Sequence, residues 1–205
     1  MGSPEDKIRN LVKERYSDIA RSGDSCCSPG CCGEPSSPFQ IVNMGQKVGY
    51  TNEQLSIGLG QANLGLGCGN PLAVADLEPG EQVVDLGCGA GFDAFLAAKN
   101  VGPDGFVIGI DMTSEMINRA EENAKKLNVE NVEFRLGTIE RLPVRDSSAD
   151  LVLSNCVINL SPNKQTVYGE IFRILKPGGR ISISDVLRSR DIPTEVKDDP
   201  SAYTG

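Results

Sequence analysis

The sequence predicts an α/β fold with a mainly parallel sheet, because short apolar stretches of strand type alternate with longer stretches of helical periodicity. The clearest strand, at 82–85, leads into a turn with three glycines in five residues and then into a helical stretch at 92–99. A second strand, at 105–110, ends in Asp111. The carboxyl ends of such strands face the ligand crevice, so the glycine turn and Asp111 are expected at a ligand site.

The other elements follow from the same periodicities. An amphipathic helix is expected at 4–20, where Ser3 is a suitable N-cap and Pro4 a suitable first helical residue. The remaining expected elements are a short helix at 53–59, helices at 114–127 and 164–175, strands at 131–136 and 150–154, and a turn with a strand at 175–185.

The turn after the first strand carries Gly87, Gly89 and Gly91. Glycine lets the chain turn sharply and lets a ligand lie against the backbone, although such a turn alone also fits a dinucleotide site. Asp111 suits the two hydroxyls of a ribose. Asp85, just before the turn, would oppose a phosphate but suits the ammonium group of an amino acid. These residues predict a ribose-bearing ligand.

The composition narrows the functional class. The chain has 205 residues and a net charge of −8, and no nucleic-acid partner is expected because nucleic-acid binders usually carry a basic face. No stretch is long and apolar enough to span a membrane, and the first residues lack signal-peptide character, so a cytoplasmic protein without a membrane partner is expected. The chain has no histidine, which removes the commonest general base and metal ligand.

Seven cysteines are the remaining candidates for chemistry: Cys26, Cys27, Cys31, Cys32, Cys68, Cys88 and Cys156. In a cytoplasmic protein they are expected to be thiols, ligands or redox partners. We interpret Cys88, inside the glycine turn, as a packing residue. Cys156 follows the strand at 150–154, where its thiol can point at the reacting group instead of packing as a small apolar residue. Cys68 lies between two glycines. They would let its thiol come close to another group, but they would equally suit a plain flexible linker.

The stretch from Asp85 to Gly91 resembles motif I of the class I S-adenosylmethionine-dependent methyltransferases, and the stretches at 108–113, 137–140 and 175–185 continue the resemblance. It implies S-adenosylmethionine as cofactor and a Rossmann-like class I methyltransferase sheet, mainly parallel, with helices on both faces. That sheet has two more strands, so a C-terminally truncated chain is expected. The expected cofactor-binding residues are Asp85, Gly87, Gly89, Gly91, Asp111, Met112, Thr138, Ile139, Asn155 and Tyr16.

Stretches at 67–69, 109–113 and 154–160 make the resemblance more specific, to the arsenite methyltransferases. This resemblance implies that Cys68 and Cys156 bind As(III), supplied as arsenite or a thiol conjugate. The lone pair of As(III) can attack a methyl group without losing a proton, which fits a chain without histidine. Because arsenic is oxidised as it is methylated, a thiol reductant such as thioredoxin or glutathione is an implied partner.

The four N-terminal cysteines leave three interpretations open. The family usually has a cysteine here that pairs with Cys68 during turnover, and Cys26, Cys27, Cys31 and Cys32 are all candidates for that relay or for arsenic delivery. A second interpretation is a bound metal ion, although the spacing departs from the usual Cys-x2-Cys pairs. The third is an inert loop, since the stretch is rich in proline, serine and glycine.

The expected organisation has three parts. They are a helical and cysteine-rich extension over the cofactor site at 1–75, a methyltransferase core at 76–187 and the start of a C-terminal substrate domain at 188–205. A monomer is expected. Two other functions remain open: a class I methyltransferase for another small molecule, such as a quinone precursor, and a thiol-based arsenic- or metal-binding protein without turnover.

Overall fold

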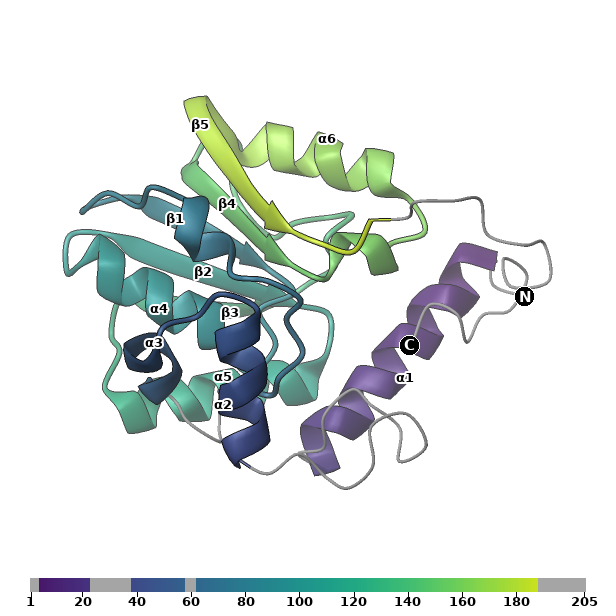
Figure 1. The fold of residues 1–205 in the computed structure, drawn as a ribbon. Coiled ribbons are helices and arrows are strands. Elements are labelled where there is room, and N and C mark those ends of the chain that lie inside the picture. Colours follow the sequence, from purple (N-terminus) through teal and green to yellow (C-terminus); the bar gives the residue numbers. More distant parts are fainter. Residues whose placement is uncertain (1–3, 23–37, 58–61, 188–205) are drawn as a thin grey trace.

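A five-stranded sheet forms the centre of the molecule, with strand order β3-β2-β1-β4-β5 (Figure 1). The computed structural model describes residues 4–22, 38–57 and 62–187. Every neighbouring pair of strands in this sheet is parallel, which confirms the predicted fold class. The strands are β1 (Gln82–Leu86), β2 (Phe106–Asp111), β3 (Val132–Leu136), β4 (Ala149–Asn155) and β5 (Leu175–Ser184).

Helices occupy much of the rest of the described chain. The α-helices are α1 (Pro4–Ser22), α2 (Pro38–Lys47), α3 (Asn52–Ser56), α4 (Phe92–Val101), α5 (Ser114–Leu127) and α6 (Lys164–Ile174), and two short 3₁₀ turns are η1 (Pro71–Val74) and η2 (Ile158–Leu160). Among the helices within these described ranges, none has the length and apolar character needed to cross a membrane.

Three elements differ from the sequence-based expectation. The sequence analysis predicts no helix at α2, because the residues before it are rich in serine and proline. Pro38 at the first position of α2 is the local signal that could have indicated this helix. The helix expected at 53–59 ends at Ser56, since Ile57 is already extended. The turn expected at 175–179 lies within β5, where a register shift between Ala149 and Leu151 of β4 accommodates it.

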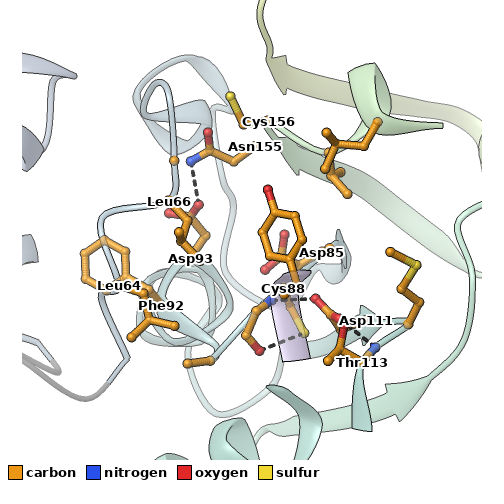
Figure 2. Close-up of a pocket in the computed structure, with 18 of the residues that line it drawn as sticks. Leu64, Leu66, Asp85, Cys88, Phe92, Asp93, Asp111, Thr113, Asn155 and Cys156 are labelled. Carbon is orange, nitrogen blue, oxygen red and sulfur yellow. Dashed lines mark hydrogen bonds between the residues drawn. The ribbon is translucent and has the colours of Figure 1, made fainter. Parts of the chain in front are cut away.

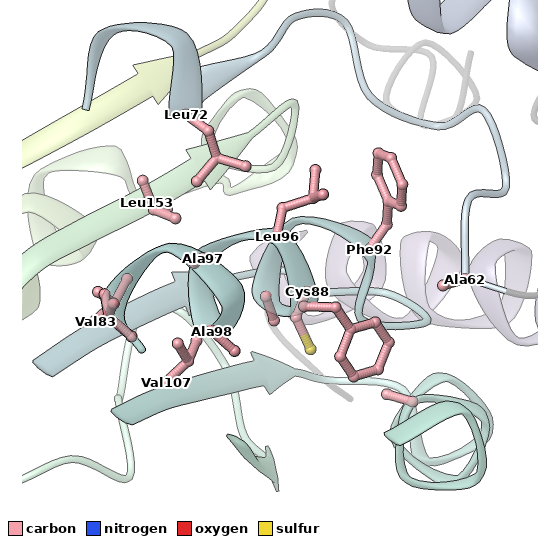
Figure 3. Packing of buried hydrophobic residues seen from close by; sticks show 14 of the residues in the cluster. Ala62, Leu72, Val83, Cys88, Phe92, Leu96, Ala97, Ala98, Val107 and Leu153 are labelled. Atoms are coloured by element: carbon pink, nitrogen blue, oxygen red, sulfur yellow. The ribbon is translucent and has the colours of Figure 1, made fainter. Parts of the chain in front are cut away.

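Two apolar clusters cover the two faces of the sheet. On one face α4 and α5 pack over the strands, and the cluster includes Val83, Val107 and Leu96 (Figure 3). On the opposite face α6 contributes Val167 to a cluster with Val84. Successive residues of a strand point to opposite faces, so Val83 and Val84 belong to different clusters. The apolar run of β1 therefore reflects burial on both faces, as is usual in a parallel sheet.

The chain leaves β1 and β4 in opposite directions along the sheet. From β1 it passes through α4 to β2, and from β4 it passes through α6 to β5. Such a reversal between two paired strands opens a crevice past their carboxyl ends. The turn after β1 and the residues after β4 are close there, because a Cβ on Gly87 would collide with the side chain of Val157.

Helix α1 packs against α5, beside the carboxyl ends of the strands (Figure 1). Its apolar stripe is buried at Val12 and Ile19, as expected for an amphipathic helix. Ser17 and Arg21 of α1 donate hydrogen bonds to the carboxylate of Glu115 on α5. These contacts hold α1 where it can form one wall of a site at the strand ends.

Candidate functional site

A pocket lies past the carboxyl ends of β1, β2 and β4, with α1 and the 62–67 stretch as further walls (Figure 2). Most of the residues expected to bind the cofactor line it: Asp85, Gly87, Gly89, Asp111, Met112, Ile139, Asn155 and Tyr16. Within the described chain, Gly91 and Thr138 are not among the residues that line it. Tyr50 and Asp93 also line the pocket, although the sequence pattern assigns no role to either.

The glycine turn presents backbone to the pocket. Gly89 has a φ of +52°, and a Cβ there would meet no atom of the described residues within 4 Å. Gly91 has a φ of +94° and precedes α4 as its N-cap. A Cβ on Gly91 would lie within 3 Å of the rings of Phe95 and Phe134. Gly89 thus leaves room for a ligand, whereas Gly91 allows tight packing beneath the turn.

Asp111 is fixed at the end of β2 by two backbone donors. Its carboxylate accepts hydrogen bonds from the N–H of Gly89 at 3.0 Å and from the N–H of Thr113 at 2.9 Å. Withdrawal from water raises the pKa of this carboxyl, and the N–H donors oppose that rise. Each carboxylate oxygen has a second lone pair, so Asp111 can still accept from the hydroxyls of a ribose.

Asp85 carries a buried carboxylate oxygen that needs a partner. The residue is 2% exposed and lines the pocket, and its Oδ2 atom has no hydrogen-bond partner among the described residues. Burial, with the charges of Asp93 and Asp111, raises the pKa of Asp85. A buried carboxylate of this kind is costly unless a donor or cation meets it. The pocket therefore suits a ligand with a cationic end near β1.

Asp93, Tyr50 and Asn155 form a hydrogen-bonded network along one wall. The Tyr50 hydroxyl donates to Asp93 Oδ1 at 2.6 Å. Asn155 Nδ2 donates to Asp93 Oδ2 at 2.9 Å (Figure 2). Burial and the Asp93 charge raise the pKa of Tyr50, so its hydroxyl keeps its proton. Asp93 is signalled in the sequence only by its place in the first turn of α4. Tyr50 has no local signal, because folding alone brings it to this wall.

Cys68 and Cys156 are joined by a disulfide at the edge of the pocket, although 88 residues separate them in the sequence. Their Cα atoms are 5.8 Å apart. Cys156 lines the pocket and has a φ of +57°, a conformation that is uncommon for a residue with a side chain and often marks a functional site. Asp185 places a carboxylate oxygen within 4.8 Å of both sulfur atoms.

The other cysteines fall into two groups. Cys88 is a free, buried thiol in the apolar cluster beneath the turn, and burial raises its pKa, as expected for a packing residue. Cys26, Cys27, Cys31 and Cys32 lie outside the described residues. The predicted pairing of one of them with Cys68 stays a prediction.

Comparison with known proteins places this architecture in a family. Residues 77–205 match a family model described as a methyltransferase domain. The chain is 49% identical to an arsenite methyltransferase of Halobacterium salinarum, over 98% of this chain and 52% of that protein. It is 35% identical to an arsenite methyltransferase of Aquipseudomonas alcaligenes, over 96% of this chain and 56% of that protein.

A solved structure agrees with the two sequence relatives. The crystal structure of CrArsM, an arsenic(III) S-adenosylmethionine methyltransferase from Chlamydomonas reinhardtii, superposes with a TM-score of 0.62 at 37% identity. The match covers 82% of this chain and 55% of that one.

The chain spans about half the length of the curated relatives that it matches. The part that matches the methyltransferase model contains all five strands, the glycine turn and Asp111. The chain therefore belongs to the methyltransferase-domain family.

Proposed function

We propose that this chain carries the cofactor- and arsenic-binding part of an arsenite methyltransferase that uses S-adenosylmethionine. One observation carries the proposal: the sulfur atoms of Cys68 and Cys156 meet at the edge of a pocket that has the turn and carboxylates for a ribose-bearing cofactor. The names of the relatives from Halobacterium and Aquipseudomonas support the same activity.

The residues at the strand ends fit S-adenosylmethionine. Asp111 would accept from its ribose hydroxyls, and Met112 and Ile139 would flank its adenine. The unpartnered Asp85 oxygen suits its ammonium group, and Tyr16 of α1 would lie near the same amino-acid end. When bound, the cofactor would supply an electrophilic methyl group to the arsenic lone pair, which has no proton to lose.

The thiol pair would hold the substrate. Once reduced, Cys68 and Cys156 would each form an S–As bond with arsenite, and the displaced hydroxides would leave as water with the thiol protons. Soft thiolates suit a soft, thiophilic ion. Methylation formally takes As(III) to As(V); two electrons from thiols return it to As(III) and leave a disulfide. An external thiol reductant of the thioredoxin or glutathione type would then reopen that disulfide.

Several finer points belong to this proposal. Residues 1–75 would cover the cofactor site, which the position of Arg9, Val12 and Tyr16 in the pocket wall supports. An N-terminal cysteine would pass electrons to, or arsenic onto, Cys68. A bound metal and an inert loop remain the competing interpretations for that cluster. A monomer in the cytoplasm is the proposed state.

Calorimetric titration of the reduced protein with As(III), with and without S-adenosylhomocysteine, tests the proposal. Tight binding to the wild type that is lost in both Cys68→Ser and Cys156→Ser would support it. The variant Cys88→Ser is the matched control, because its thiol is free and buried in the apolar cluster beneath the glycine turn, and it should bind As(III) as the wild type does. Unchanged As(III) binding in both of the first two variants would refute the assignment.

A further inference from the structure

We propose that Asn155 is a positioning residue, which holds the loop carrying Cys68 against the end of β4 and so keeps the two thiols together before any ligand binds. Asn155 directly precedes Cys156, so one residue links both members of the pair. The purpose of this link rests on the proposed arsenic chemistry, whereas the link itself rests on hydrogen bonds within the protein.

The Asn155 amide holds the loop on both sides of the Cys68 side chain. Its Oδ1 atom accepts a hydrogen bond from the backbone N–H of Cys68 at 3.1 Å. Its Nδ2 atom donates to the backbone carbonyl of Gly69 at 2.9 Å. An amide is suited to this pair of contacts, because it combines one acceptor with two donor hydrogens.

Asp93 and Tyr50 fix the orientation of the Asn155 amide. Asn155 Nδ2 also lies 2.9 Å from Asp93 Oδ2 and 3.0 Å from the Tyr50 hydroxyl oxygen. The Asp93 carboxylate accepts at both oxygens, because the Tyr50 hydroxyl donates to its Oδ1 atom at 2.6 Å and Asn155 Nδ2 donates to its Oδ2 atom. The amide nitrogen must therefore face Asp93, which leaves the amide oxygen facing the Cys68 loop. The hydrogen-bonding capacity of Asn155 is thus used within the protein.

The loop fits around this amide only because it has glycines there. A Cβ on Gly67 would lie 2.6 Å from Asn155 Nδ2, and a Cβ on Gly69 would collide with the Ser184 side chain at the end of β5. The loop is thereby seated against the ends of both β4 and β5. Such seating lowers the entropy lost when the two thiols act on one ion or on each other.

The equilibrium of the Cys68–Cys156 disulfide with glutathione measures how closely the thiols are held. In Asn155→Ser, which removes most of these hydrogen bonds, the effective concentration of one thiol at the other should fall by about tenfold to a hundredfold. Peptide mass mapping quantifies this disulfide in the full chain, because cleavage after Glu78 and Glu81 separates Cys68 from Cys88.

Asn131→Ser is the matched control. The Asn131 amide also donates to backbone carbonyls, those of Ala98 and Gly102 at 3.0 and 2.8 Å, but it does so where β3 begins, at the opposite edge of the sheet. It should lower thermal stability without changing the glutathione equilibrium. A comparable loss of thiol pairing in both variants would reduce Asn155 to a general stability role and overturn the inference.

Gly67→Ala gives a second test that does not alter Asn155. Its added methyl should push the amide and the loop apart and weaken thiol pairing severalfold in the wild type. In the Asn155→Ser background the same substitution should have little further effect, because the colliding group is absent. Effects that simply multiply would overturn the inference. If Asn155→Ser does not fold, Gly67→Ala in the wild type still tests the inference, and unchanged thiol pairing in that single variant would overturn it.

The glutathione measurement needs no arsenic, so it separates this inference from the proposed function. Failure of the reduced wild type to bind As(III), with normal thiol pairing, would count against the function alone. Normal As(III) binding together with an unchanged equilibrium in Asn155→Ser would count against the role of Asn155 alone.

Discussion

The two ends of the pocket differ in how the chain builds them. One end, which we call the ribose end, consists of Gly87, Gly89 and Asp111, contributed by one continuous β1–α4–β2 stretch. The other, the thiol end, consists of Cys68, Asn155 and Cys156, and its cysteines lie 88 residues apart. Backbone donors set the ribose end locally, whereas the packing of a distant loop sets the thiol end.

The two ends also differ in charge. The carboxylates of Asp85 and Asp111 lie at the ribose end, and burial raises the pKa of both. At the thiol end the contacts that hold Cys68 come from the neutral Asn155 amide and from close packing of glycines. Substitutions at the ribose end should therefore act through charge and ligand recognition, and those at the thiol end through geometry.

The largest effect is expected at Asp111, whose loss tests whether the two ends are independent. Asp111→Ala should lower S-adenosylhomocysteine affinity by on the order of a thousandfold, because two charge-assisted hydrogen bonds to the ribose are lost. Calorimetry measures this, with Glu133→Ala as a control carboxylate that lies outside the pocket. The Cys68–Cys156 equilibrium with glutathione should not change in Asp111→Ala; a change would mean that the ends are coupled.

The next effect concerns the packing beneath the turn. Gly91→Ala should lower the free energy of unfolding by about 2–4 kcal/mol, since it adds left-handed backbone strain to a collision with Phe95 and Phe134. Urea unfolding measures it. Gly80→Ala is the matched control, because Gly80 has a φ of +88° and a Cβ there would meet no described atom within 4 Å, so strain alone should cost about 1–2 kcal/mol. Equal losses of stability in the two variants would show that the packing beneath the turn has room for the added methyl group.

A smaller effect, with a defined pH dependence, is expected at Asp85. The raised pKa means that the folded protein holds this proton at a pH where the unfolded chain, with a carboxyl pKa of about 3.9, releases it. Wild-type stability should therefore fall as pH rises from the unfolded pKa through the folded one. Without cofactor, Asp85→Asn should be more stable than the wild type by on the order of 1 kcal/mol at pH 8, with the difference shrinking towards pH 4.

Urea unfolding of both proteins across that pH range measures the Asp85 contribution. A constant difference between them would mean that the carboxyl does not titrate in the folded protein as its burial implies. The same substitution should weaken S-adenosylhomocysteine binding at pH 8, because a neutral amide replaces the carboxylate that faces the ammonium group.

The smallest effect is expected at Cys88, which lies between Gly87 and Gly89 in the glycine turn. Cys88→Ala removes one buried sulfur and should cost about 1 kcal/mol or less of stability. It should leave As(III) stoichiometry unchanged. In the native wild type Cys88 should react with iodoacetamide far more slowly than after unfolding, because burial excludes the reagent and raises the thiol pKa. Rapid native labelling would contradict the separation of this thiol from the reactive pair.

Local sequence patterns predicted the ribose end well because its parts are neighbours in the chain. A strand, three glycines and a helix in direct succession leave little freedom in where Gly89 and Asp111 lie. The family resemblance implied that both Thr138 and Ile139 bind the cofactor, and of the two only Ile139 lines the pocket. Thr138 follows β3 as expected but forms a bridge with Arg141.

That Cys68 acts together with Cys156 was expected only from the resemblance to the arsenite methyltransferases, because no local sequence pattern connects these two residues. The flanking glycines of Cys68 were equally consistent with a linker, and no pattern connects Tyr50 with Asp93 or Asn155. These residues meet only after β1 and β4 pair and the 65–70 stretch lies across the ends of β4 and β5.

The sequence by itself determined the parallel α/β sheet, the glycine turn, the acidic strand ends and the cysteines available for chemistry, because each depends on residues within a few positions of one another. Only the tertiary structure decided that Cys68 meets Cys156, that Asn155 joins their two segments and that Asp85 has an oxygen with no hydrogen-bond partner in the described part of the chain. The physical reason is that strand order and loop packing set contacts between distant residues, and no local periodicity records them.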